Sequence, residues 1–530
     1  MGVAWQLKRA KWRLTEAKWR VEEAYAKTRR SSRKAADKIR RGTQKLLLTD
    51  LPTEILTLIL GHFCMHCRDS GNPTVQAFFP SSWGHVLPET WYDDDRRALR
   101  NACLTSRRLG AVAQHILHHV FLQDYAPSNP DLSPPPEPQW TPRVSLFLRT
   151  LAARPDLAAA VRHFHIASDG DYVTRGTDEL ILLPPPGPTP IRPLGFEEEE
   201  EAKVTLNHRL PPRMACVARI LARTRNLQTI SMSHAMWTCK DNLRTALLAA
   251  GVRELGVRRV DVCNVFPRPW ETAWVVLEFA AGSVRELAVH GKDVLVEMGK
   301  WRLPGRRLEG LWKLTVTGAK VKGKDELGVV LERLGCEKLK ELKYEPVIRL
   351  RHYNSYLSPY SAKVLLKNQR TLRSLHLDFQ TRDYLTSAAD PTSPCLEYLD
   401  LPNFPVLEDL FLNTLLLFTR PEDYKEPRDL QEDREVLTRI LPPSIVRLRL
   451  VDGIVSGDLH IRVWKLLSRA LEGLAEAVNK GRFPKLRSVW YDTAHSLQDR
   501  RIQGEFGANG VEFEWKDLPI SRSVRRRDRD

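Results

Sequence analysis

The residues best suited to metal chemistry lie close together near the end of an apolar segment: His62, Cys64, His66 and Cys67. Thiolate and imidazole are the ligands that zinc prefers, and a C-x-x-C pair supplies half of a four-coordinate site. Two further donors would be needed to complete it, and the next histidine along the chain is His85. Since free cysteine is also a common buried hydrophobe, the sequence by itself predicts no metal and no other cofactor.

Catalytic motifs do not occur in the sequence. It contains no G-x-S-x-G nucleophile elbow, no complete phosphate-binding loop, no H-E-x-x-H and no glycine fingerprint for a dinucleotide. Each of these motifs places a nucleophile, a phosphate cradle or a metal ligand through its spacing. The protein is therefore expected to be non-catalytic.

The apolar segment before the cysteines, residues 48–63 (LTDLPTEILTLILGHF), predicts a helix with a strong start signal. Thr49 or Asp50 can cap it, Pro52 is tolerated in the first turn, and Glu54 suits the positive end of the helix dipole. The apolar residues recur at helical spacing and form one broad stripe. A single helix cannot bury that stripe, so partner helices are required.

Residues 99–122 (LRNACLTSRRLGAVAQHILHHVFL) repeat the helical pattern. The pattern breaks near Thr105 and Ser106, where a new N-cap can begin another helix. Three short helices from these two segments would close one small core. An insertion at about 64–94 separates the two segments.

The L-P-x-E-I-L-x-x-I segment at 51–59, followed by C-L-T-S-R-R-L at 103–109, resembles the F-box domain frequent in filamentous fungi. The resemblance implies a small helical bundle over about 46–125 that docks on the Skp-type adaptor of a cullin–RING (SCF-type) ubiquitin ligase. The residues that match the motif, and are therefore expected to bind the adaptor, are Leu51, Pro52, Glu54, Ile55, Leu56, Ile59, Leu60, Leu104, Arg108 and Leu109.

The formal charge of +17 is concentrated at the two ends of the 530-residue chain. Residues 1–45 hold 15 Lys or Arg against 4 Asp or Glu, and residues 521–530 hold 5 Arg against 2 Asp. The body is therefore nearly neutral and has no basic stripe with interleaved aromatics of the kind that binds nucleic acid. Contact with nucleic acid or an anionic membrane is expected only through the tails.

The basic arm, residues 1–45, contains three seven-residue units with one helical seam of Leu, Val and Ala. Trp5, Trp12 and Trp19 line another side of the same predicted helix. Such an arm either packs loosely on its own protein or docks on a partner or an anionic membrane surface.

Three segments of biased composition divide the rest of the chain. Residues 126–142 are dense in proline and predict a stiff connector. Residues 182–203 end in an acidic run and predict a disordered surface loop, which could also serve as an acidic docking segment. Residues 516–530 form a basic tail, and no apolar stretch is long enough to span a membrane.

A recurring pattern dominates residues 143–515: an apolar residue, two variable ones, an apolar residue, one variable one and another apolar residue. Between 227 and 396 its copies begin 24 to 33 residues apart, which is room for one strand and one helix. Helices are expected between the copies, for example over 211–225, 241–250, 273–281, 324–334, 361–368 and 460–479. The ten copies begin at Val161, Leu227, Val252, Val284, Leu311, Leu339, Leu372, Leu396, Ile445 and Leu486.

This recurrence resembles a divergent array of leucine-rich repeats, which implies a curved solenoid whose units cover one another's apolar faces. The expected fold class is α+β: a small all-α F-box bundle followed by an α/β horseshoe with parallel strands on the concave face. Side chains alternate across a strand, so the variable positions should face the concave surface. Those expected to bind a target protein are His376, Asp378, Tyr398, Asp400, Arg447, Arg449 and Trp490.

The two resemblances together imply a substrate-recognition subunit of an SCF-type ubiquitin ligase, in the cytoplasm, the nucleus or both. The F-box would bind the adaptor and the repeats a target protein, in a non-catalytic role. The alternative is a ligase-independent interaction scaffold whose basic tails contact nucleic acid or membrane.

Overall fold

A computed structural model of the chain describes residues 48–68, 90–122, 143–167, 212–233, 240–264, 270–291, 307–320, 326–347, 357–378, 399–414, 417, 430–451, 458–493 and 500–517. The predicted basic arm, the connector and the acidic loop lie outside these residues. So do the basic tail after Asp517 and most of the predicted insertion, including His85.

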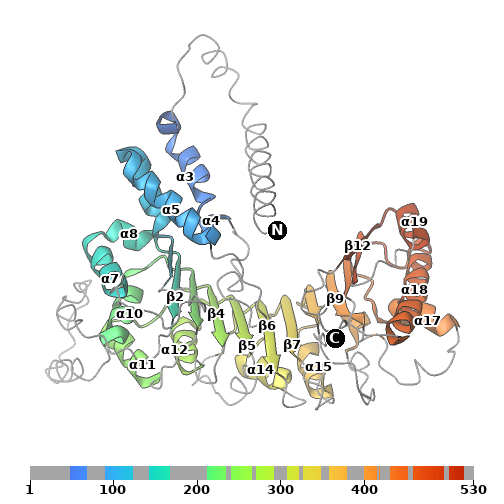
Figure 1. Cartoon of the computed structure of the whole chain (residues 1–530). Helices are drawn as coiled ribbons and strands as arrows, with labels where there is room; N and C mark the ends of the chain where they lie inside the picture. Colours follow the sequence, from blue (N-terminus) through green and yellow to red (C-terminus); the bar gives the residue numbers. More distant parts are fainter. Residues whose placement is uncertain are drawn as a thin grey trace, which may run out of the picture.

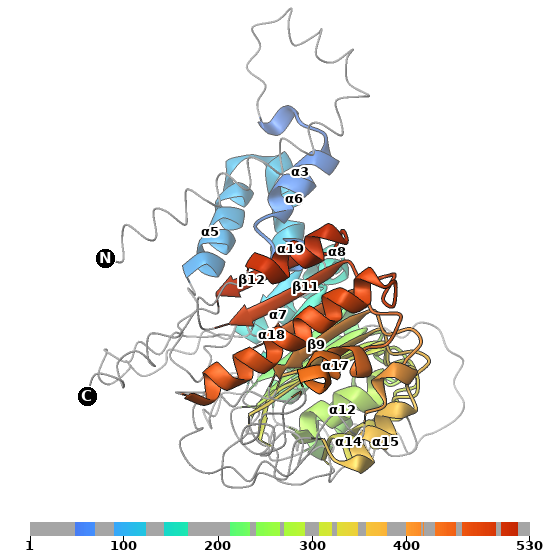
Figure 2. The same cartoon turned by 90° about the vertical axis from the view of Figure 1, so that its right-hand side faces the viewer.

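The N-terminal helices form a unit with its own hydrophobic core. Leu56 and Leu60 from the first apolar segment pack with Leu109, Val112 and Ile116 from the second. Figures 1 and 2 show these helices projecting away from the rest of the molecule. The elements of this helical unit are η1 (Leu48–Asp50), α3 (Thr53–Gly61), α4 (Met65–Arg68), α5 (Thr90–Thr105) and α6 (Arg107–Leu117).

Of the two predicted helix starts, one is confirmed and the other is wrong. The break predicted at Thr105 and Ser106 is confirmed: the Ser106 hydroxyl caps α6 by accepting the Leu109 amide at 3.1 Å. The cap predicted for the first helix is wrong, since Pro52 is the N-cap of α3 and no side chain caps it. Residues 48–50 instead form η1, which precedes α3 as a separate turn.

Twelve parallel strands form one sheet in which every strand pairs with the next strand along the chain. Figure 1 shows the strands on the inner side of a broad arc, with helices along its outer side. The strands are β1 (Val120–Leu122), β2 (His163–Ala167), β3 (Thr229–Ser233), β4 (Arg259–Asn264), β5 (Glu286–Gly291), β6 (Lys313–Lys320), β7 (Glu341–Val347), β8 (Ser374–Leu377), β9 (Asp409–Asn413), β10 (Arg447–Val451), β11 (Ser488–Thr493) and β12 (Glu512–Asp517).

Helices connect most of the strands, as the crossover between parallel neighbours requires. They are α7 (Arg143–Ala153), α8 (Pro155–Ala160), α10 (Pro212–Arg223), α11 (Lys240–Ala249), α12 (Trp270–Ala280), α14 (Glu326–Leu334), α15 (Pro359–Leu366), α17 (Leu430–Ile440), α18 (Asp458–Asn479) and α19 (Arg500–Ala508), with η4 (Leu401–Asn403) before β9. Six of them, α10, α11, α12, α14, α15 and α18, begin and end close to the six ranges expected from sequence. The helices bury apolar side chains in the core that they share with the sheet.

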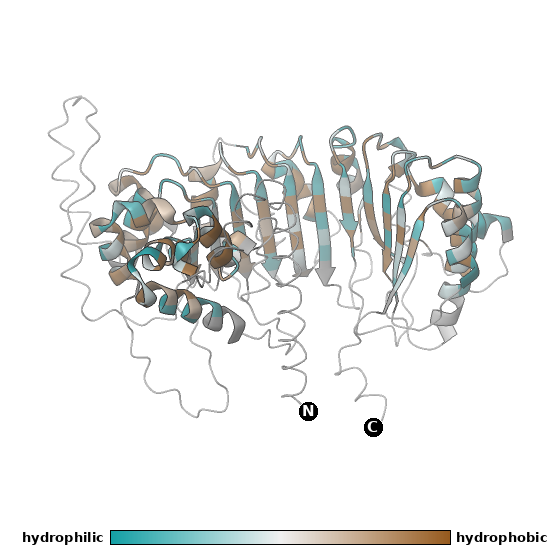
Figure 3. Ribbon diagram, turned by 90° about the horizontal axis from the view of Figure 1, so that it is seen from above, coloured by the Kyte–Doolittle hydropathy of each residue, from teal (hydrophilic) through white to brown (hydrophobic). Residues whose placement is uncertain are grey.

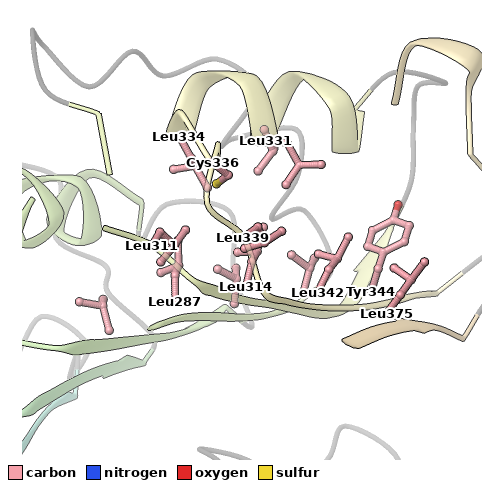
Figure 4. Close-up of a cluster of buried hydrophobic side chains, with 14 of the residues drawn as sticks. Leu287, Leu311, Leu314, Leu331, Leu334, Cys336, Leu339, Leu342, Tyr344 and Leu375 are labelled. Carbon is pink, nitrogen blue, oxygen red and sulfur yellow. The ribbon is translucent and has the colours of Figure 1, made fainter. Parts of the chain in front are cut away.

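Apolar side chains of successive strands lie in register on the face of the sheet that the helices cover. Leu314 pairs with Leu342, Leu342 with Leu375, and Leu375 with Leu410, and all four are buried. Figure 4 shows Leu314, Leu342 and Leu375 of this row on the side of the sheet that faces α14, which carries Leu331 and Leu334. One residue of slip would move every leucine to the opposite face, so the row fixes the register. From above, the strands lie side by side with alternating hydropathy (Figure 3).

The same backbone contact recurs at the entry to the strands. The Lys340 carbonyl, just before β7, accepts the amides of Arg373 and Ser374 at 2.8 and 2.9 Å. The first contact of this series is at His119, whose carbonyl accepts the Arg162 and His163 amides, both at 2.9 Å. The repeated geometry therefore begins directly after α6, at β1.

Two of the ten predicted strand positions are wrong. The copy placed at 252–257 lies in the turn before β4, and the strand uses Val257, Val260 and Val262 instead. The described part of the copy placed at 396–401 leads into η4, and β9 uses Leu407, Leu410 and Leu412. In both places the neighbouring window fits the same apolar spacing, so the pattern alone cannot choose between them. The other eight copies coincide with strands.

Candidate functional site

The residues predicted to bind an adaptor divide between the core and the surface of the helical unit. Leu56, Leu60 and Leu109 are buried in its core and are not available to a partner. Pro52 and Glu54 are exposed at the start of α3, and Leu51, Ile55 and Ile59 are half-buried. The available surface is therefore the other side of α3 and the end of α5, where Leu104 lies.

The most exposed large apolar side chains of the helical unit are Leu104, at 85%, and Leu58, at 66%. Arg108 is exposed, but its guanidinium donates to the carbonyls of Thr49 and Leu51, both at 2.8 Å. Arg108 thus ties the segment before α3 to the start of α6. Exposed leucines on a fixed backbone are suited to docking on another protein.

On the inner face of the sheet, one row of paired positions runs across five strands from β7 to β11. Register pairs Lys343 with His376, His376 with Phe411, Phe411 with Arg449, and Arg449 with Trp490. All five side chains are half-buried. We call this set the central row. It includes Arg449, Phe411 and Trp490, and arginine and aromatic residues are enriched at protein-recognition surfaces.

Stacking and ion pairs hold the central row in place. The rings of His376 and Phe411 stack with centroids 3.6 Å apart and an angle of 8° between their planes. The Arg449 guanidinium lies 5.2 Å from the Phe411 centroid, and its Nε donates to an Asp492 oxygen at 2.6 Å. These side chains are ordered before any partner arrives, which lowers the entropic cost of binding.

A buried carboxylate anchors one end of the central row. The Glu345 Oε1 atom lies 2.8 Å from His376 Nε2 and 2.9 Å from Lys343 Nζ. Burial alone would raise the pKa of Glu345, but these two neighbours outweigh it and lower the pKa to about 2. Asp378, directly after β8, lies close by and accepts the Asn413 side-chain amide at 3.3 Å.

Replacing Glu345 by glutamine should flatten the acid side of the stability profile. Because the folded-state pKa is depressed from 4.5 to about 2, the carboxylate stabilises the fold fully above about pH 4.5. That stability is lost as pH falls toward 2, and it is at most about 3 kcal/mol. Urea unfolding at pH 6, 4 and 3 should show the difference between wild type and Glu345→Gln shrinking with acidity. A difference that stays constant would contradict the assignment.

Side chains on the inner face of the first strands are buried. His163 Nε2 and His165 Nδ1 each lie 2.7 Å from the Ser231 hydroxyl, and all three side chains are buried. Burial lowers the pKa of His163 to about 3, so its ring is neutral. Asp261 is also buried, which raises its pKa to about 6 although Arg259 donates to it at 2.8 Å. Among the described residues, these positions on β2, β3 and β4 are therefore closed to a partner.

Sequence reasoning located part of this surface. His376, Arg449 and Trp490 lie in the central row, and Arg447 lies in the next row, paired with Asp409. Asp378 is buried beside Asn413, and Tyr398 lies outside the described residues. Asp400 is not on the sheet but at the start of η4, because the strand position predicted there was wrong. Phe411 was missed for the same reason.

The candidate zinc ligands are only partly as the sequence suggested. Cys64, His66 and Cys67 converge at the end of α3 and in α4, and the structure adds His119, which follows α6. His62 is exposed and is not part of this group. The hydrogen bond between the thiols raises the pKa of Cys64 and lowers that of Cys67. The fourth donor, His119, comes from a distant segment, so the local spacing of cysteines and histidines could not predict it.

Comparison with known proteins gives no match: no protein-family model fits the chain, and no curated protein matches it. Within the described part of the chain, every helix is too short or too polar to cross a lipid bilayer.

Proposed function

We propose that this protein is a substrate-recognition subunit of an SCF-type ubiquitin ligase. In this proposal the helical unit is an F-box that binds a Skp-type adaptor, and the sheet is a leucine-rich-repeat solenoid that binds the target protein. The observation that carries it is the separation into two hydrophobic cores, one with exposed leucines and one with an ordered recognition row.

The proposed role requires no bond chemistry from this chain. A receptor that holds a target near a charged ubiquitin-conjugating enzyme contributes proximity and orientation. The continuous parallel sheet supports this, because its stacked strands share one core and can hold a target at a fixed distance from the helical unit. The resemblance at 51–59 and 103–109 supplies the identity of the adaptor.

Affinity purification of variants tests the adaptor half of the proposal. Changing Leu58 and Leu104 to glutamate should reduce the co-purified Skp-type adaptor by about 30-fold, as loss of about 2 kcal/mol at a docking hot spot would. Leu248→Glu, at a leucine of α11 that is 57% exposed, is the matched control and should retain the adaptor. Wild-type protein that never retains an adaptor would refute the proposal.

Variants of the central row test the proposed binding of a target protein. Phe411→Ala combined with Arg449→Ala should leave the adaptor bound and remove the target proteins from the same purification. Arg373→Ala, at an exposed position just before β8, is the control and should lose neither. If deletion of residues 1–45 instead abolished a strong, steeply salt-dependent binding to nucleic acid, the scaffold alternative would be favoured.

A further inference from the structure

The donor atoms of Cys64, His66, Cys67 and His119 all lie within 4.8 Å of one another. Cys67 Sγ is 3.2 Å from His119 Nδ1 and 3.7 Å from His66 Nδ1, and Cys64 Sγ is 3.9 Å from His119 Nδ1. In a tetrahedral zinc site with metal–ligand bonds of about 2.0–2.3 Å, neighbouring donors are roughly 3.3–3.8 Å apart. The observed separations are therefore close to those of a zinc site.

The ligand set selects the metal. Two thiols and two imidazoles suit zinc, whereas magnesium and calcium require oxygen donors. Both cysteines are free thiols, so both are available as thiolates. With four protein donors there is no open position for a substrate, which makes the site structural.

A contact outside the four donors orients one of them. His66 Nε2 lies 3.2 Å from the Gln228 side-chain oxygen. When Nε2 carries the proton and donates to Gln228, Nδ1 is left unprotonated and points to the cysteines. Metal-binding histidines almost always have such a partner on the second ring nitrogen.

The four residues join the two halves of the protein. Cys64 is in the core of the helical unit, at the end of α3. The His119 carbonyl begins the series of contacts between repeats, and Gln228 occupies the equivalent place two repeats later, where its carbonyl accepts the Arg258 and Arg259 amides. A metal held here would connect α3 and α4 to the entry of the first strands.

We propose that Cys64, His66, Cys67 and His119 bind one zinc ion that fixes the helical unit to the edge of the sheet. The site does not depend on the ligase function. If that function holds, the zinc ion sets the angle between adaptor and target, since it braces the junction between the two parts.

Metal analysis of the full chain, purified without chelators after growth with added zinc, tests this proposal. We expect about one zinc per chain in the wild type and much less in Cys67→Ser and His119→Ala. Cys103→Ser and His115→Ala are matched controls, because both lie in the same helical unit outside the four donors, and they should retain the zinc. Folded wild-type protein with zinc far below one per chain would overturn the proposal, as would equal zinc in all variants.

Two further measurements separate loss of metal from loss of fold. Cobalt substituted for zinc should show thiolate-to-cobalt charge transfer and intense tetrahedral d–d bands in the wild type, and the charge-transfer band should weaken in Cys67→Ser. Gln228→Ala leaves all four donors in place and should weaken zinc affinity by about 10- to 100-fold in a chelator competition. Unchanged affinity in Gln228→Ala together with a cobalt spectrum lacking thiolate bands would contradict the proposed ligands.

Discussion

Replacing Gly473 by alanine is expected to lower the free energy of unfolding by about 3 kcal/mol, the upper part of the range for overpacked cores. Gly473 lies in α18 where that helix crosses α17. A Cβ atom at this position would lie 2.0 Å from the Arg434 carbonyl oxygen and 2.7 Å from its carbon. These are backbone atoms, which cannot rotate away as a side chain can. One helix must therefore shift, and the apolar contacts between α17 and α18 are lost in part.

The chain provides its own control for this prediction. Gly504 is inside α19, and a Cβ atom added there meets nothing within 4 Å. Gly504→Ala should raise stability by about 1 kcal/mol, because alanine favours the helix over glycine. Urea unfolding followed by circular dichroism would measure both variants. Equal effects of the two substitutions would show that α17 and α18 do not approach as closely as described.

Phe404→Ala is expected to cost about 3–5 kcal/mol, the range for emptying a phenylalanine site in a core. Phe404 is fully buried between η4 and β9, in the unit where a turn of 3₁₀ helix precedes the strand. Its carbonyl also accepts the Ser444 hydroxyl at 3.2 Å, which connects this unit to the next one. Loss of the ring would leave a cavity at the least regular point of the array.

The loss should be local, because each unit of a stacked array contacts mainly its neighbours. Hydrogen exchange should therefore accelerate in residues 399–414 and 430–451, while β3 and β4 keep their protection. Phe404→Leu is the control, since it keeps most of the volume and should cost less than about 1.5 kcal/mol. Faster exchange spread evenly over the sheet would contradict the unit-by-unit packing.

Much of the sheet could be predicted from sequence because its strands repeat one constraint. Each strand must place two apolar residues, two positions apart, on the face of the sheet that the helices cover. A third apolar residue lies in the turn before the strand. The prediction was wrong at Leu396 and Val252, where a second window nearby satisfies the same spacing. Burial does not distinguish the two windows near 396, because Leu399, which precedes η4, and Leu401, which begins it, are buried as well. The outer strands β1 and β12 were missed because, in the register of the other repeats, His118 and Gly510 occupy the position of the first apolar residue.

The functional surfaces were less predictable, since they depend on segments that only the fold brings together. His119 is 52 residues from Cys67, and nothing in the spacing distinguishes it from His115 or His118. It reaches the cysteines because α6 packs against α3. The burial of Leu56 and Leu60 likewise follows from that packing, whereas the motif alone assigned them to an interface.

The most direct test of the proposed division of labour is co-expression of the chain with a Skp-type adaptor, followed by size-exclusion chromatography with mass measurement. The proposed function predicts a stable one-to-one complex that forms with wild type and with Phe411→Ala combined with Arg449→Ala. The same complex should be absent when Leu58 and Leu104 are changed to glutamate. A wild-type chain that is folded but elutes alone, with no adaptor, would contradict the central claim.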